Sequence, residues 1–221
     1  MDFSLIKSCD QHTAMEIYDA SMHGKIGVNV GHVSGISNML LTILHQNPEL
    51  LNVHAYNYRE GILSSMVVPQ YCYTQEKAAG LLAECNEEAD SIAEKIRNSR
   101  LSTYDSVIRV HDILARKVKY EYDLSYEDHS IVGALLTQTG CCESISKAFK
   151  FILDKLEIPC LCVSGDAYDA GRGKRDAHMW NMVCISGNWC HVDVTFDLAV
   201  KGFTSIPHFY FGLDDLSIKR D

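Results

Sequence analysis

Apolar residues recur at helical spacing in two long segments near the middle of the chain. Residues 75–99 place small and aliphatic side chains on one face, with acidic residues opposite. Residues 103–118 begin at a Thr103 N-cap and carry a second apolar stripe, made of Val107, Val110, Ile113, Leu114 and Val118. We predict two amphipathic helices here, and we expect both to pack against the half of the chain that follows.

The residues before these helices mix helical and strand-like patterns. The elements predicted there are helices over residues 10–22 and 34–46 and strands over residues 52–58 and 62–74. Pro69 interrupts the second strand and marks an edge or a bulge. We therefore predict a mixed α/β region over residues 1–100, which either contributes substrate contacts or serves as a packing partner.

From residue 130 onward the pattern changes to one helix followed by strands. Residues 143–156 carry a one-sided apolar face at steps of three and one, and Pro159 prevents the helix from continuing. The predicted strands are residues 160–165, 178–185 and 188–196, the last two joined by a tight turn. A helix followed by an antiparallel meander indicates an α+β fold, and we predict a second domain over residues 101–221.

The composition is that of a globular protein and argues against several classes of partner. The 221 residues, 47% hydrophobic and 22% charged, suffice for one good-sized core or two small ones. A net charge of -9 without a dense Lys/Arg cluster argues against nucleic acid. Because no apolar run approaches 18 residues and the start lacks a signal pattern, we expect a cytoplasmic protein with no membrane partner, unless a secretory leader was trimmed.

The cysteine usage bears on the redox state. The chain has nine cysteines, an odd number, and several lie inside apolar strand-like runs. This pattern favours reduced thiols over a disulfide framework.

Cys142 immediately precedes the helix predicted over residues 143–156. The unpaired backbone N–H groups and the dipole at a helix N-terminus favour a thiolate, which is the nucleophilic form of cysteine. The same N–H groups can receive the oxyanion that forms on an attacked carbonyl. Position alone favours the interpretation of Cys141 and Cys142 as small apolar residues that cap a core helix, so a base must be found elsewhere to support a catalytic role.

His178 opens a predicted strand, and Asp193 lies on the strand that follows it. Both registers allowed by a two-residue turn, at Ser186-Gly187 or one residue later, put these two side chains on the same face. The first register makes them diagonal neighbours and places Asp193 opposite Trp180. An inward carboxylate is costly to bury unless a charge such as an imidazolium matches it, although an Asp bonded to backbone in a turn is the plainer interpretation.

Two other histidines compete for the role of base. His191 shares the face of Asp193, but side chains two residues apart on one strand stand parallel, so we rank it below His178. For His129 we expect a surface or capping role.

Metal chemistry is the main competing interpretation of these residues. The side chains of metal-ligand type are Cys141, Cys142, His178, Cys190 and His191. No CxxC or HxxxH pair occurs, and residues 171–174 lack the strand and capped helix of a phosphate-binding loop. We therefore predict no metal and no cofactor.

At these residues the sequence resembles the bacterial transglutaminase-like superfamily. The resemblance rests on GCCES (140–144), SKAFKFILDKLEIPC (146–160), HMWN (178–181) and HVDVTFD (191–197), in family order and spacing. It extends over residues 104–215, and by position the family triad falls on Cys142, His178 and Asp193. The sequence departs from the family pattern at Cys141, Glu143, Ser144, Met179 and Phe196, none of which removes a reacting group.

The resemblance implies a papain- or transglutaminase-like core, with the nucleophile at a helix N-terminus packed on an antiparallel sheet. We expect a protein or peptide substrate whose amide is attacked by Cys142, with a thioester resolved by water or by an amine. Water makes the protein a peptidase or amidase, which is our leading prediction, and an amine makes it a transglutaminase. The alternative of another class is a binding module that keeps the fold without turnover.

Four further residues are candidates for supporting roles. Gln138 or Tyr120 is expected to donate to the oxyanion beside the backbone N–H of Cys142. Trp180 and Glu143 are candidates for substrate contact, and the charge on Glu143 either weakens a neighbouring thiolate or favours a basic substrate.

Overall fold

The computed structural model describes residues 1–8, 10–31, 33–59, 61, 64–121, 125–169, 173–199 and 205–218, without the side chains of Glu127, Asp169 and Ala199. The chain divides into two compact units, Met1–Ala83 and Glu84–Asp221. The division lies inside one long helix, α3 (Gln75–Asn98). The domain boundary predicted after residue 100 stays a prediction. None of the described helices is long and apolar enough to cross a membrane.

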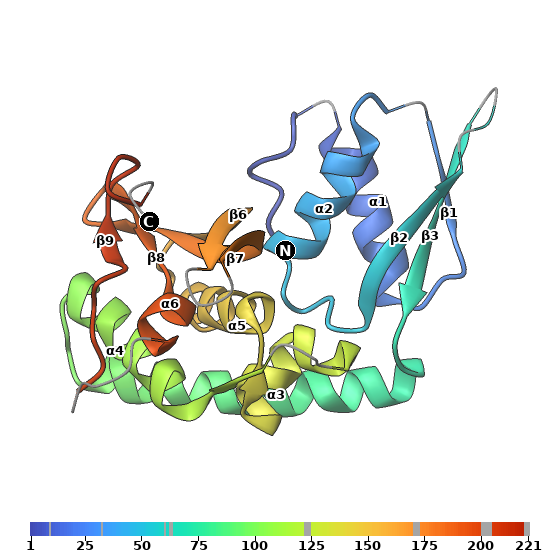
Figure 1. The fold of residues 1–221 in the computed structure, drawn as a ribbon. Coiled ribbons are helices and arrows are strands. Elements are labelled where there is room, and N and C mark those ends of the chain that lie inside the picture. Colours follow the sequence, from blue (N-terminus) through green and yellow to red (C-terminus); the bar gives the residue numbers. More distant parts are fainter. Residues whose placement is uncertain are drawn as a thin grey trace. The chain divides into compact units, whose positions relative to one another are not determined.

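The first unit packs two helices against a small antiparallel sheet with strand order β1-β3-β2 (Figure 1). Its elements are α1 (Gln11–Met22), β1 (Val28–Val30), α2 (Ile36–Gln46), β2 (Val53–Arg59) and β3 (Ser65–Tyr71). Ile17, Ile43 and Val67 are fully buried in its core. Pro69 lies in the part of β3 beyond its pairing with β1, where a missing N–H costs no bond to that strand.

The second unit is an α+β structure, as predicted. Its elements after α3 are α4 (Thr103–Lys117), β4 (Lys119–Tyr120), the 3₁₀ turn η1 (Tyr126–His129), the π-helical turn η2 (Gly133–Thr137), β5 (Thr139–Gly140), α5 (Cys142–Lys155), β6 (Cys160–Asp169), β7 (Lys174–Ile185), β8 (Asn188–Val192), α6 (Val194–Ala199) and β9 (Phe211–Leu213). Four antiparallel strands in the order β6-β7-β8-β9 form its sheet, and α5 packs against β6 and β7 (Figure 1).

The helix α5 is the centre of this unit. Phe149, Ile152 and Leu153 are fully buried, and even two lysines on the helix are largely hidden from solvent. Lys150 is tolerated there because its ammonium donates to the backbone oxygen of Cys160 at 2.8 Å and pairs with the carboxylate of Asp154 at 3.1 Å. A helix held on most sides gives its first residue, Cys142, a fixed position.

Two local details differ from the sequence-based expectations. The N-cap of α4 is Ser102 and not Thr103, since the Ser102 hydroxyl accepts the N–H of Asp105 at 3.1 Å. The strand predicted over residues 188–196 was wrong beyond Val192, because residues 194–199 form α6. The Asp193 carboxylate accepts the N–H of Phe196 at 3.0 Å, which starts a helix where the apolar alternation indicated a strand.

The hairpin of β7 and β8 has the first of the two predicted registers. Ile185 pairs with Asn188 across a Ser186-Gly187 turn. Both turn residues have positive φ, 52° and 84°, as a type I′ turn requires. Residue 193 therefore follows the end of β8 beside the part of β7 that carries His178 and Trp180.

Candidate active site

The segment before Cys142 is held at close quarters to the first turn of α5. Gly140 is needed there, because a Cβ atom at this position would collide with the hydroxyl of Ser144. Ser144 in turn donates to the backbone oxygen of Cys141 at 3.1 Å. Cys142 thus begins α5 with its thiol at the helix N-terminus, as expected from the sequence.

Two buried side chains tie the first turn of α5 to β7. The Ser146 hydroxyl donates to the backbone oxygen of Met179 at 2.9 Å, and the Asn181 amide donates to the backbone oxygen of Ser146 at 3.0 Å. The backbone N–H of Met179 also lies against the Cys142 thiol. Ser146 and Asn181 were not predicted as site residues; the available signal was a polar Asn inside an apolar strand.

The structure brings His178 and Asp193 into direct contact. His178 Nε2 lies 2.6 Å from Asp193 Oδ2, and the two side chains are 7% and 2% exposed. Asp193 Oδ1 accepts the N–H of Phe196, so each oxygen of the carboxylate has a hydrogen-bond partner. An ionised carboxylate only accepts, which makes Nε2 the donor and leaves the lone pair on Nδ1 of His178. Nδ1 is then the nitrogen able to take a proton.

Aromatic rings keep the His178 imidazole in its plane. The ring of Phe196 is nearly parallel to it at 4.5 Å between centroids, and that of Trp180 at 6.0 Å. Trp180 Nε1 donates to His191 Nδ1 at 2.9 Å, while His191 Nε2 lies 3.0 Å from an oxygen of Asp215. His191, the rival base, therefore holds Trp180 in place.

The neighbouring thiols Cys141 and Cys142 interact strongly with each other. The pKa of Cys141 is lowered to about 6, mainly by a hydrogen bond from the Cys142 thiol and further by the backbone N–H of Ser144 and by His129. The pKa of Cys142 is raised, first by that bond to Cys141 and then by burial and by the charge on Cys141. The two pKa shifts have opposite directions, which makes Cys141 the more acidic thiol of the pair.

Cys141 also belongs to a small polar cluster. Its Sγ lies 3.4 Å from Nδ1 of His129, which was expected to have a surface or capping role. Glu143 lies 3.2 Å from the same nitrogen and accepts from Lys147 at 2.7 Å. The hydrogen bond to Glu143 raises the pKa of His129. Glu143 thus belongs to this cluster through its contacts with His129 and Lys147, and its proposed contact with substrate stays a prediction.

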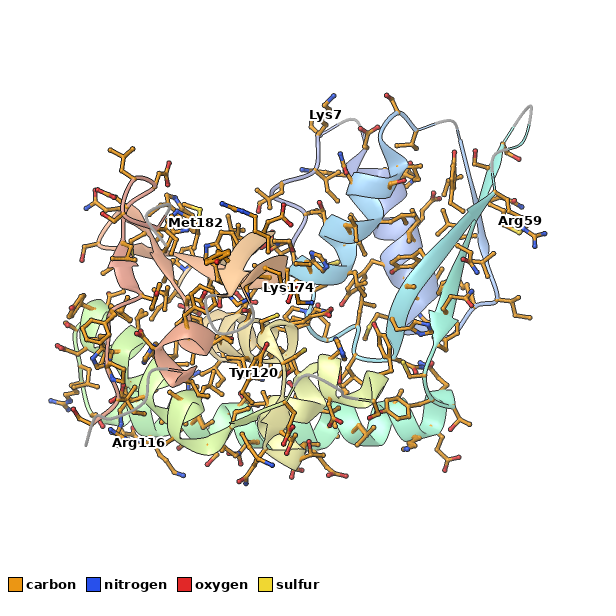
Figure 2. All side chains as sticks on the ribbon, viewed as in Figure 1. Lys7, Arg59, Arg116, Tyr120, Lys174 and Met182 are labelled. Carbon is orange, nitrogen blue, oxygen red and sulfur yellow. The ribbon has the colours of Figure 1, made fainter. Side chains whose placement is uncertain are left out.

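One of the two oxyanion candidates lies in the strand pair that leads to Cys142, and the other immediately precedes β5 of that pair. Tyr120, labelled in Figure 2, is in β4 and pairs in register with Gly140 of β5. Gln138 is exposed, and its backbone oxygen accepts the N–H of Lys119 at 2.8 Å. Their role as side-chain donors stays a prediction.

A cavity of about 530 Å³ opens beside the His178–Asp193 pair. Its lining includes the apolar rings of Trp180 and Phe196 and the charged side chains of Asp166, Arg175 and Asp215. Among the described residues, one group of metal-ligand type converges, His111 with Asp112 and His208. It contains none of the five side chains considered for zinc from the sequence.

Residues 90–194 match the family model described as Transglutaminase-like superfamily. Among solved structures the chain is similar to a TGase (12% identity, TM-score 0.46, covering 90% of this chain and 60% of that one). It is also similar to a candidate cysteine protease from Cytophaga hutchinsonii, with 13% identity and a TM-score of 0.42, over 64% of this chain and 61% of that one. A third similar structure is the periplasmic domain of TgpA from Pseudomonas aeruginosa bound to ethylmercury, with 16% identity and a TM-score of 0.41, over 62% of this chain and 57% of that one. The chain spans about three-fifths of the length of each. A search of curated protein sequences gives no match.

Proposed function

We propose that the chain is a cysteine-nucleophile enzyme that cleaves peptide or side-chain amides, which agrees with the match of residues 90–194 to the transglutaminase-like superfamily model. Cys142 is the nucleophile, His178 the general base and Asp193 the residue that orients the base. The observation that carries the proposal is the buried 2.6 Å contact between His178 and Asp193, next to the backbone N–H that touches the Cys142 thiol.

The protonation of the thiol pair determines the first step. Because the interaction with Cys141 and burial raise the pKa of Cys142, its attack on the carbonyl carbon is coupled to transfer of the thiol proton to Nδ1 of His178. The backbone N–H of Cys142 at the start of α5 stabilises the oxyanion. The proton taken from Cys142 makes His178 an imidazolium, which Asp193 stabilises. His178 then returns that proton to the leaving amine, which yields a thioester on Cys142 and a neutral His178.

Water is the proposed acceptor of the acyl group, which makes the activity that of a peptidase or amidase. The cavity beside His178 carries three charged side chains, Asp166, Arg175 and Asp215, and such a lining retains water next to the base. Deacylation by an amine, which would make the protein a transglutaminase, uses the same residues. The experiment must therefore determine whether water or an amine accepts the acyl group.

The test is a library of glutamine-containing peptides and peptide amides, incubated with the protein with and without methylamine and read by mass. We expect the peptides to show the masses of the hydrolysed products, with little incorporation of methylamine. Peptides that lose ammonia and gain the amine in preference to water would overturn hydrolysis in favour of transamidation.

Three variants separate chemistry from folding. Cys142→Ala and His178→Ala are expected to abolish turnover, and Cys190→Ala, which removes a thiol on β8, is the matched control that keeps it. A thioester adduct should accumulate on Cys142 when deacylation is slowed at low pH. Turnover that survives in Cys142→Ala would refute the proposed nucleophile.

A further inference from the structure

Three side chains of metal-ligand type meet at the end of the second unit where α4, α6 and β9 lie together (Figure 1). His111 and Asp112 are neighbours on α4, and His208 precedes β9. Asp112 Oδ1 lies 3.3 Å from Nδ1 of His111 and 2.8 Å from Nε2 of His208. His111 is completely buried, whereas the other two side chains are 15% and 35% exposed.

The tautomer of His111 is fixed from its other side. Asp197 is fully buried, and its Oδ1 accepts the N–H groups of Phe209 and Tyr210 at 2.8 and 3.1 Å. Its Oδ2 lies 3.1 Å from Nε2 of His111. This carboxylate accepts, so Nε2 carries the hydrogen and Nδ1 carries a lone pair directed at Asp112.

A lone pair facing a carboxylate oxygen at 3.3 Å is unfavourable unless a positive charge lies between them. A proton or a metal ion supplies that charge. Metal-binding histidines characteristically donate their second nitrogen to a carboxylate, which is the arrangement of His111 with Asp197.

The three candidate ligand atoms lie within 4.8 Å of one another, and one of their separations is that of a zinc site. Zinc bonds of 2.0–2.1 Å in tetrahedral geometry place neighbouring ligand atoms about 3.3 Å apart, the separation between Nδ1 of His111 and Oδ1 of Asp112. The 2.8 Å separation to His208 is that of a direct hydrogen bond, and zinc would replace its proton. His208 is partly exposed, which allows the small outward shift that this requires.

From this geometry we propose that His111, Asp112 and His208 form a zinc site, with water as the fourth ligand. Asp112 binds through one oxygen, because its other oxygen lies 3.2 Å from the guanidinium of Arg116, an exposed side chain labelled in Figure 2. The ion clamps the segment around His208 to α4. That segment includes Tyr210, whose backbone oxygen accepts the N–H of Asp193 at 2.8 Å, so the clamp lies one hydrogen bond from the proposed triad.

The test measures zinc binding to untagged, reduced protein by calorimetry. We expect one zinc per chain, with affinity reduced on the order of 100-fold or more in His208→Ala and in the isosteric Asp112→Asn. The control is His12→Ala, which removes an exposed histidine that faces Glu16 at 3.6 Å and that belongs to no group of three metal ligands among the described residues. Zinc should raise the midpoint of thermal unfolding in the parent protein and in His12→Ala only.

Cobalt distinguishes this site from the thiols. Co²⁺ bound here should give visible d–d bands without a thiolate charge-transfer band, and the bands should be lost in Asp112→Asn. Far-UV circular dichroism in the presence of a chelator checks that each variant folds. If His208→Ala does not fold, the zinc affinity of Asp112→Asn alone tests the proposed site. Absence of zinc binding to the parent protein, equal binding by both ligand variants, or a spectrum dominated by thiolate overturns the proposal.

Discussion

Replacing Cys141 by valine should make Cys142 the more acidic thiol. In the parent protein Cys141 is 6% exposed, and its lowered pKa makes it the more acidic thiol of the pair. Valine removes both the charge and the acceptor of the Cys142 hydrogen bond, which is the largest cause of the raised pKa of Cys142. The backbone N–H of Met179 and the N-terminus of α5 are then left to stabilise a thiolate on Cys142.

The expected change follows from the distance between the two sulfurs. Thiols in hydrogen-bond contact are about 4 Å apart, where unit charges interact by about 4 kcal/mol at an effective dielectric constant of about 20. This corresponds to roughly three pKa units. Cys142 is only partly shielded from solvent, so we expect a decrease of roughly half that size and a thiolate fraction at neutral pH that is roughly 10- to 30-fold larger.

Alkylation by iodoacetamide as a function of pH, with the label located by mass spectrometry, measures this change. The midpoint for Cys142 should move to lower pH in Cys141→Val and stay in place in Cys190→Val, which removes a thiol elsewhere. An unchanged or higher midpoint for Cys142 in Cys141→Val refutes the assignment of the lower pKa to Cys141.

The same substitution should alter the pH dependence of stability. Cys141 has a pKa of about 6 in the folded protein, below its ordinary value of 9.0, so between these pH values the unfolded chain binds the additional proton. The free energy of unfolding therefore rises from pH 6 towards pH 9, with a slope of at most about 1.4 kcal/mol per pH unit, and this contribution is lost as the pH falls through 6. Urea unfolding should show the slope in the parent protein and a smaller slope in Cys141→Val.

Three further substitutions test the packing around the site. Asp193→Asn should lower kcat/KM by about 10³- to 10⁴-fold while circular dichroism stays unchanged, because the amide still caps α6 but no longer stabilises an imidazolium; an active variant contradicts the orienting role. Trp180→Phe deprives His191 of its donor and should cost about 1 kcal/mol in urea unfolding, and no loss would contradict that bond. Gly140→Ala should cost about 1–3 kcal/mol through the clash with Ser144; if adding Ser144→Ala recovers none of it, the clash is not the cause.

Periodic segments were located well from the sequence, because their patterns are local. The helix predicted over residues 75–99 is α3, and the hairpin turn at Ser186-Gly187 fixed the register that brings His178 to Asp193. Residues 194–196 were misassigned to a strand, because a short run of alternating apolar character fits a strand and the start of a short helix alike. Only the N-cap formed by Asp193 distinguishes the helix from the strand, and that cap depends on the tertiary position of Asp193.

Contacts between segments without periodic patterns could not be predicted. His129 reaches Cys141 through the short turns η1 and η2, which show no amphipathic spacing. His111 and Asp197 are 86 residues apart, and each lies on a helix whose apolar face says nothing about the partner of a buried polar group. Such pairs follow from how the elements pack, and the sequence of either element alone does not encode them.

The backbone bond from Asp193 to Tyr210 has a consequence during synthesis of the chain. Cys142 and its helix leave the ribosome more than fifty residues before Tyr210 does, and the backbone N–H of Asp193 gains its partner only after Tyr210 has been made. A nascent chain therefore carries the proposed nucleophile before the backbone of Asp193 is fixed. On the proposed function, chains stalled on the ribosome ahead of residue 210 should turn over substrate more slowly than the full chain.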